Sequence, residues 1–163
     1  DTCQVRLELA AGADPNCRWH WRGLGRKPLL AACEAGHVET IKVLLACGAD
    51  PNDGDCLGHT PACAAARVGS LAGLQALRQA GASLTTPDCS GSTPLYFAIE
   101  RGHTEMVRFL INTADADIKV ERIDGRTALW AAAAGGHNDI LQELLAVADG
   151  VSLDGRAVDG STP

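Results

Sequence analysis

The feature that most constrains the fold of this chain is an internal repeat with a period close to 33 residues. Four similar segments begin at Gly25, Gly58, Gly91 and Gly125, so the steps between them are 33, 33 and 34 residues. Such a period is typical of solenoid arrays, in which each unit is one supersecondary motif that buries its apolar face against its neighbours. The fold prediction therefore begins with one repeat.

Each repeat opens with signals for a turn followed by a helix. In the segment GHTPA, Gly58 suits a turn that needs a positive φ, Thr60 is a good N-cap, and Pro61 fits the first helical position. The segment GSTPL from Gly91 repeats this order. We expect a short first helix after each opening, rich in alanines that allow a neighbouring helix to come close.

A glycine ends each predicted first helix, and a second helix follows. The apolar residues Val107, Leu110 and Ile111 show the helical spacing expected of that second helix. A histidine follows the glycine in three repeats, and a residue repeated in this way is more readily structural than catalytic. The glycines in the C-cap position are Gly36, Gly69, Gly102 and Gly136, and the histidines are His37, His103 and His137.

The period, the Thr-Pro-Leu segment at 93 to 95, the Gly-His pairs and the segment LLACGADPN resemble the ankyrin repeat family. The resemblance covers nearly the whole chain and implies an all-α solenoid of stacked helix-turn-helix units with hairpin fingers. We predict one ankyrin-repeat domain over 1–163, and we expect it to be a fragment of a longer protein because solenoids need capping repeats. The predicted divisions are a partial repeat at 1–16, full repeats at 22–54, 55–87, 88–121 and 122–156, and the start of a further repeat at 157–163.

The chain departs from the family pattern at several positions. The family carries a histidine after Thr-Pro-Leu that forms hydrogen bonds between units, and none of the four repeats has it, so we expect stability to depend more on apolar stacking. Lys27 replaces the capping threonine of the first repeat, and Gly73 weakens a second helix by roughly 1 kcal/mol relative to alanine. The histidine positions are occupied by Leu30, Cys63, Tyr96 and Trp130.

Charge and cysteine content limit the classes of function. The chain has 20 acidic and 14 basic residues and a net charge of −6, which argues against a general nucleic-acid binder, because phosphate binding depends on Lys and Arg. Seven cysteines form no tight framework, so we expect reduced thiols. There is no apolar run of about 18 residues and no signal peptide pattern. We expect a monomeric cytoplasmic or nuclear protein with no membrane segment, metal or cofactor.

The resemblance implies a protein-interaction module whose concave face consists of the fingers and first helices. Positions that differ from repeat to repeat are free to contact a partner, and their mixture of arginine and aromatic residues is typical of interfaces. The alternative is a regulatory or substrate-recruiting arm of a larger enzyme, ubiquitin-ligase adaptor or channel. The predicted partner-binding residues are Trp19, Trp21, Arg22, Leu24, Arg26, Cys56, Leu57, His59, Arg67, Ser90, Ser92, Tyr96, Arg101, Ile123, Arg126 and Trp130.

The first finger, in the segment CRWHWRGLG, is three residues longer than the next one. Trp19 and Trp21 alternate with polar residues, which in an extended strand places both indoles on one side. Three interpretations remain open: local core, a protein-binding hot spot, or base stacking beside arginines.

The segment CLGHTPAC places two cysteines and a histidine within eight positions, a crowding that raises the question of a metal site. The repeat register puts Cys56 and His59 on the second finger and Cys63 at the start of a first helix. A zinc site formed by Cys56, His59 and Cys89 lacks a clear fourth ligand, so we interpret the two finger residues as contact positions. The resemblance also makes Asn52 a candidate for hydroxylation.

Overall fold

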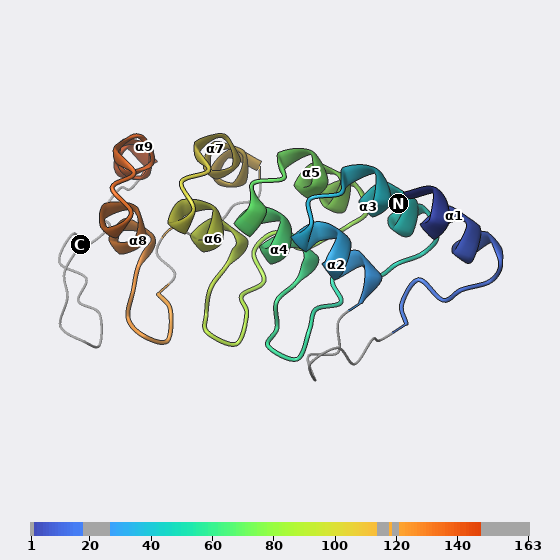
Figure 1. Ribbon diagram of the computed structural model, residues 1–163. Coiled ribbons are helices and arrows are strands. Elements are labelled where there is room, and N and C mark those ends of the chain that lie inside the picture. Colours follow the sequence, from blue (N-terminus) through green and yellow to red (C-terminus); the bar gives the residue numbers. More distant parts are fainter. Residues whose placement is uncertain (1, 18–26, 114–117, 119–120, 148–163) are drawn as a thin grey trace. The chain divides into compact units, whose positions relative to one another are not determined.

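The structure is a computed structural model that describes residues 2–17, 27–113, 118 and 121–147. Within these residues the regular secondary structure is entirely helical (Figure 1), which confirms the predicted all-α class. The helices are α1 (Thr2–Ala10), α2 (Pro28–Glu34), α3 (Val38–Ala46), α4 (Pro61–Val68), α5 (Leu71–Gln79), α6 (Pro94–Glu100), α7 (Thr104–Thr113), α8 (Ala128–Ala134) and α9 (Asn138–Val147).

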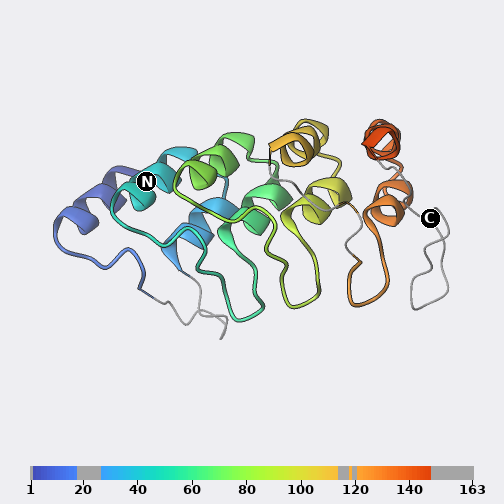
Figure 2. The same ribbon diagram turned by 180° about the vertical axis from the view of Figure 1, so that it is seen from behind.

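The helices belong to two compact units, Asp1–Ser83 and Leu84–Pro163. In the first unit, the first helices α2 and α4 pack side by side, and the second helices α1, α3 and α5 form a separate row (Figures 1 and 2). In the second unit, α6 packs on α8 and α7 packs on α9. Each unit is therefore a two-layer stack of helix pairs, with the second helix of each repeat packed on its first.

The predicted N-caps form at the start of the first helices. The side-chain oxygens of Thr60 and Thr93 each accept a hydrogen bond of 3.2 Å from the backbone N–H three residues later, and Thr127 does the same in the fourth repeat. Lys27 makes no such bond at the start of α2, and its buried ammonium instead forms an ion pair with Asp53. Lys27 thus forms no local cap but contacts Asp53, which lies just before the second finger.

The predicted C-cap glycines also adopt the expected conformation. Gly69 ends α4 with a φ of 76°, in the left-handed region that glycine enters without a steric penalty. The glycines at the equivalent positions of the other repeats are Gly36, Gly102 and Gly136, with φ of 68°, 72° and 67°.

The core consists of aliphatic residues from the second helices packed on small residues of the first helices. Ile41 and Leu44 of α3 are fully buried, as are Val107 and Leu110 of α7. Alanines at the layer of first helices have almost no exposed surface, and their short side chains allow the close helix approach that the sequence predicts. These alanines are Ala32, Ala62, Ala65, Ala66, Ala98 and Ala132.

Gly73, expected only to weaken α5, is buried at a close contact between helices. A Cβ atom at this position would lie 3.1 Å from Ile41 Cδ1 on α3 and 2.7 Å from Ser70 Oγ. The glycine therefore permits α5 to approach α3, a packing role that its helix propensity does not reveal.

Asparagine side chains link successive turns of the first unit. The Asn16 amide donates a hydrogen bond of 3.1 Å to the carbonyl of Gly48 and accepts one of 2.9 Å from the backbone N–H of Asp50. Asn52 makes the same pair of bonds with the next turn, at 3.3 and 2.7 Å. Polar contacts between repeats are thus present in the first unit, at positions other than that of the missing family histidine.

Candidate partner-binding surface

The second finger, residues 55–60, is a tight turn organised by one carboxylate. Asp55 Oδ1 accepts hydrogen bonds from the backbone N–H groups of Leu57 and His59, at 2.9 and 3.0 Å. The ring of His59 lies 3.2 Å from the other carboxylate oxygen and is half-buried. Cys56 and Leu57 are exposed, with 45% of the Leu57 surface accessible.

The third finger, residues 88–93, has the same construction. Asp88 Oδ1 accepts hydrogen bonds from the backbone N–H groups of Ser90 and Ser92 and from the Ser90 hydroxyl, at 2.8, 2.9 and 2.7 Å. Ser92 is only 1% exposed and Tyr96, on α6, only 5%. Because both side chains face the interior, the prediction that they contact a partner is corrected, whereas Ser90 is half-buried.

The fourth finger, residues 122–127, is built differently. Arg122 occupies the position of the organising aspartate, and the turn is held instead by Asp124, whose Oδ1 accepts a hydrogen bond of 3.2 Å from the backbone N–H of Arg126. The backbone N–H of Ile123 donates to the carbonyl of Ser90 at 3.0 Å, which ties this finger to the third. The Ile123 side chain remains 78% exposed.

Two arginines of the fourth finger stack on aromatic rings of the first helices. The guanidinium carbon of Arg122 lies 5.0 Å from the ring centre of Tyr96, and that of Arg126 lies 4.3 Å from Trp130. Both distances are within the range of attractive cation–π contacts. We call this cluster, formed by Tyr96, Arg122, Asp124, Arg126 and Trp130, the arginine ledge.

The electrostatics of the arginine ledge keep Arg122 charged. Burial lowers the pKa of its guanidinium, but the Tyr96 hydroxyl and the nearby carboxylates of Asp124 and Glu100 more than compensate, so that the pKa is raised. Asp124 Oδ2 lies between the two guanidinium groups, 3.6 Å from Arg122 Nη2 and 3.7 Å from Arg126 Nε. One carboxylate is therefore shared by two cations.

The two other arginines in the predicted set occupy different surroundings. Arg67 on α4 forms an ion pair of 3.1 Å with Glu34 on α2, so it ties two first helices of the same unit together. Arg101 is exposed at the end of α6, and its guanidinium lies 3.9 Å from the Glu100 carboxylate. Five predicted residues, Trp19, Trp21, Arg22, Leu24 and Arg26, lie outside the described residues.

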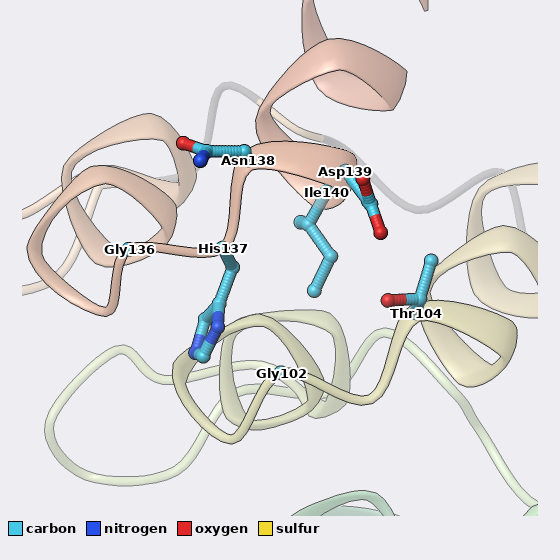
Figure 3. A pocket seen from close by; sticks show the side chains of 7 residues that line it. All are labelled: Gly102, Thr104, Gly136, His137, Asn138, Asp139 and Ile140. Carbon is cyan, nitrogen blue, oxygen red and sulfur yellow. The ribbon is translucent and has the colours of Figure 1, made fainter.

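A hollow of about 360 Å³ lies in the second unit, beside the turns that join α6 to α7 and α8 to α9 (Figure 3). The His137 ring fills the space beside Gly102, since a Cβ atom added there would lie 2.7 Å from it, and its Nε2 is 3.3 Å from the carbonyl oxygen of Glu100. Asp139 and Thr104 point toward one another across the opening. His137 thus packs at the start of its second helix, the structural role that the repeated Gly-His pair predicts.

The cysteines and histidines do not assemble into a metal cluster among the residues that the structure describes, where no three or more potential ligands come together. Cys56 is exposed on the second finger, whereas Cys63 is buried in α4, so the crowding in CLGHTPAC does not persist in space. In the described part of the chain, which includes every cysteine, no disulfide forms. Burial, with a smaller effect from Glu34, raises the pKa of Cys33 to about 12.

The fold and the fingers define a class: a helical repeat protein made of helix pairs joined by hydrogen-bonded turns. The family described as ankyrin repeats (3 copies) matches residues 2–88 and 80–157, which together span nearly the whole chain. The chain therefore belongs to the ankyrin repeat family. Members of this family are generally protein–protein interaction modules and typically have no catalytic activity.

Two further findings concern relatives of the chain and helices that could cross a membrane. Among curated proteins, no match to this chain is found. Across the described residues, every helix is too short or too polar to cross a lipid bilayer.

Sequence reasoning missed Arg122, which stacks on Tyr96 and shares the Asp124 carboxylate with Arg126 in the arginine ledge. The signal was present in the repeat alignment, because the finger position held by Asp55 and Asp88 changes to Arg122. Since arginine cannot accept the backbone hydrogen bonds that Asp55 and Asp88 accept, this change indicates that another residue holds the fourth turn.

Proposed function

We propose that the chain is a protein-interaction module that binds its partner through the fingers and first helices. The observation that carries this proposal is the combination of the arginine ledge with the exposed Ile123. Arginine and tryptophan are enriched at the centres of interfaces, and here Arg126 and Trp130 lie on or next to the finger that carries an exposed aliphatic side chain. Isolated exposed aliphatic residues are common, but one that adjoins such a cluster supports a contact role.

The mechanism is the display of contact groups on turns that are already ordered. Each described finger has a carboxylate that accepts hydrogen bonds from its own backbone: Asp55, Asp88 or Asp124. A partner that meets such a turn does not have to order it, and the conformational entropy lost on binding is correspondingly small. Within a larger protein, the same face would recruit a substrate or a regulator to an active domain.

The composition of the chain supports the rest of the proposal, which concerns location, oligomeric state and the type of partner. We place the protein in a reduced compartment, cytoplasmic or nuclear, as a monomer that binds protein rather than nucleic acid. The excess of acidic residues supports the choice of protein, since nucleic acid favours basic surfaces.

A pull-down with paired variants tests the function. The finger variant carries Leu57→Ser and Ile123→Ser, and the matched control carries Leu145→Ser and Val147→Ser on α9, which removes aliphatic groups of similar exposure, 45% and 52%, from a second helix. We expect proteins captured by the wild type to be lost with the finger variant and retained with the control.

Two results would contradict the proposal when circular dichroism shows equal helix content in all variants. One is equal recovery of every captured protein with the finger variant. The other is capture that disappears on nuclease treatment, which would indicate nucleic acid as the primary ligand.

A further inference from the structure

The chain contains four Thr-Pro steps, and three of them lie in the described residues. They begin at Thr60, Thr86 and Thr93, and the fourth begins at Thr162. A threonine followed by proline is the target sequence of one large class of protein kinases, so by sequence alone the steps are equal candidates for phosphorylation. The structure separates them by exposure and by local conformation.

Two of the described steps are the starts of helices. Thr60 Oγ1 and Thr93 Oγ1 each accept a hydrogen bond from the backbone N–H three residues later. Pro61 and Pro94 are the first residues of α4 and α6. Thr60 is only 6% exposed, and Thr93 is half-buried. A kinase would reach either hydroxyl only after the first turn of its helix had opened.

The third step lies in the irregular segment between α5 and α6. Thr86 is followed by Pro87 in a stretch without helix or strand. Three consecutive residues, Thr85, Thr86 and Pro87, are exposed, whereas Leu84 before them and Asp88 after them are buried. This Thr-Pro step is therefore displayed at the surface of a segment whose two ends are anchored.

Hydrogen bonds and the proline favour an extended chain at this step. The backbone N–H of Ser83 donates to the Asn52 side chain at 2.7 Å, and that of Asp88 donates to the carbonyl of Ser92 at 3.0 Å. A residue that precedes proline is driven out of the helical region of φ and ψ, which applies to Thr86. Protein kinases bind their substrates as extended segments, so little local opening is needed here.

The proline also defines the class of enzyme. Pro87 has no backbone N–H, so an active site without an acceptor at this point accepts proline and disfavours residues whose N–H would stay unpaired. In the transfer, Thr86 Oγ1 attacks the γ-phosphorus of ATP, and the bond from that phosphorus to the oxygen of the β-phosphate breaks. ADP leaves, and the hydroxyl proton passes to the catalytic aspartate of the kinase.

We propose that Thr86 is a phosphorylation site for a proline-directed protein kinase. The phosphate adds a charge of about −1.5 to −2 near neutral pH. At the exposed Thr86 this charge remains in water, whereas at Thr60 it would enter a buried position and displace a helix cap. The proposal concerns a covalent change of the chain itself and does not depend on the proposed interaction function.

The experiment uses the 163-residue protein with Thr162→Ala, which removes the Thr-Pro step outside the described residues. The folded protein is incubated with a purified proline-directed kinase and Mg²⁺-ATP, and tryptic peptides are sequenced by tandem mass spectrometry. Trypsin cuts after Arg78 and Arg101, so fragment ions must distinguish Thr86 from Thr93 within one peptide. We expect an initial rate at Thr86 about tenfold or more above the rates at the two capping threonines.

A synthetic peptide of residues 79–100 supplies the matched control for the preference of the kinase. It contains Thr86-Pro87 and Thr93-Pro94 without the fold. We expect the peptide to be phosphorylated at both threonines and the folded protein at Thr86. The contrast measures what the structure, rather than the sequence, contributes to the choice of site.

Variants at the exposed positions test the step itself. Thr86→Ala should abolish incorporation in this segment, and Thr86→Ser should restore it. Pro87→Ala should lower the rate about tenfold or more, because the new N–H lacks an acceptor in the kinase. Thr85→Ala changes the neighbouring exposed threonine and should alter the rate less than about twofold. Circular dichroism checks that the helix content of each variant is unchanged.

Three outcomes would overturn the proposal. The first is a folded protein that stays unmodified at Thr86 while the peptide is phosphorylated there, which would show that the fold conceals this hydroxyl. The second is an equal rate at Thr86 and Thr93 in the folded protein. The third is incorporation at Thr86 that persists undiminished in Pro87→Ala.

Discussion

The third and fourth fingers of the second unit form similar turns that are held by different side chains. In the third, Asp88 at the first position accepts three hydrogen bonds from Ser90 and Ser92, and Ser92 is buried. In the fourth, Asp124 at the third position accepts one backbone hydrogen bond, and the first position is left to Arg122. The difference shows that the carboxylate that holds the turn can lie two residues further along the chain. The first position is then open to a different residue, here Arg122.

The largest difference that we expect is in the reactivity of two thiols, one on a finger and one in the interior. Cys89 is exposed on the third finger, whereas Cys33 on α2 is 0% exposed, and burial raises its pKa from 9.0 to about 12. At pH 8 the thiolate fraction of Cys33 is roughly a thousandfold below that of a thiol with a pKa of 9, so we expect alkylation of Cys89 within minutes and of Cys33 only on unfolding. Peptide mapping after iodoacetamide treatment measures both.

The raised pKa of Cys33 also has a consequence for stability. The folded state keeps the thiol protonated up to a pH of about 12, whereas the unfolded chain releases the proton near pH 9. The unfolded state therefore binds fewer protons between these values, and the contribution to stability present below pH 9 is lost as the pH rises toward 12. Rapid alkylation of Cys33 at pH 8 in the folded protein would contradict its burial.

The next largest effect is expected from removal of the organising aspartate of the third finger. Asp88→Ala should lower the free energy of unfolding by about 3 kcal/mol, because three donors lose a charged acceptor at a buried site. Urea unfolding followed by circular dichroism measures the change. Asp88→Asn retains one acceptor oxygen and should cost less. A loss below about 1 kcal/mol for the alanine variant would mean that the finger does not depend on this carboxylate.

The equivalent change in the fourth finger should be smaller. Asp124→Ala removes one backbone hydrogen bond of 3.2 Å and two ion pairs longer than 3.5 Å, and we expect a loss of about 1 kcal/mol. The same unfolding experiment applies. A loss equal to that of Asp88→Ala would remove the distinction between the two fingers.

Conversion of the fourth finger toward the third should have the smallest effect on stability. Arg122→Asp loses the contact with Tyr96 but supplies a carboxylate at the first position, so we expect the free energy of unfolding to change by less than about 1 kcal/mol. A loss above about 2 kcal/mol would identify Arg122 as a residue required for folding.

The sequence predicts those parts of the fold that depend on local chemistry. Thr60 and Thr93 cap helices and Gly69 ends one because capping requires only residues a few positions away. The function of Gly73 could not be predicted in this way, since it depends on Ile41 in a different helix. The repeat period located the helix pairs, but the approach of one helix to another became apparent only in three dimensions.

The candidate surface was predicted less completely, for a related reason. Variation from repeat to repeat was used to identify contact positions, and three of the positions so identified, Cys56, Leu57 and Ile123, are exposed. Variation does not distinguish an outward side chain from an inward one, and Ser92 and Tyr96 were included although both are buried. Exposure depends on the path of the finger, which the spacing of residues does not define.

The side-chain hydrogen bonds that Asn16 and Asn52 make between turns have a consequence for how such a chain can gain repeats. Each asparagine side chain bonds to a backbone carbonyl and a backbone N–H of the following turn, two residues apart. The joint between neighbours is therefore independent of the side chains that the next turn carries. A gene segment encoding one such repeat could be duplicated or exchanged, and its product would already possess a matching connection to the repeat beside it.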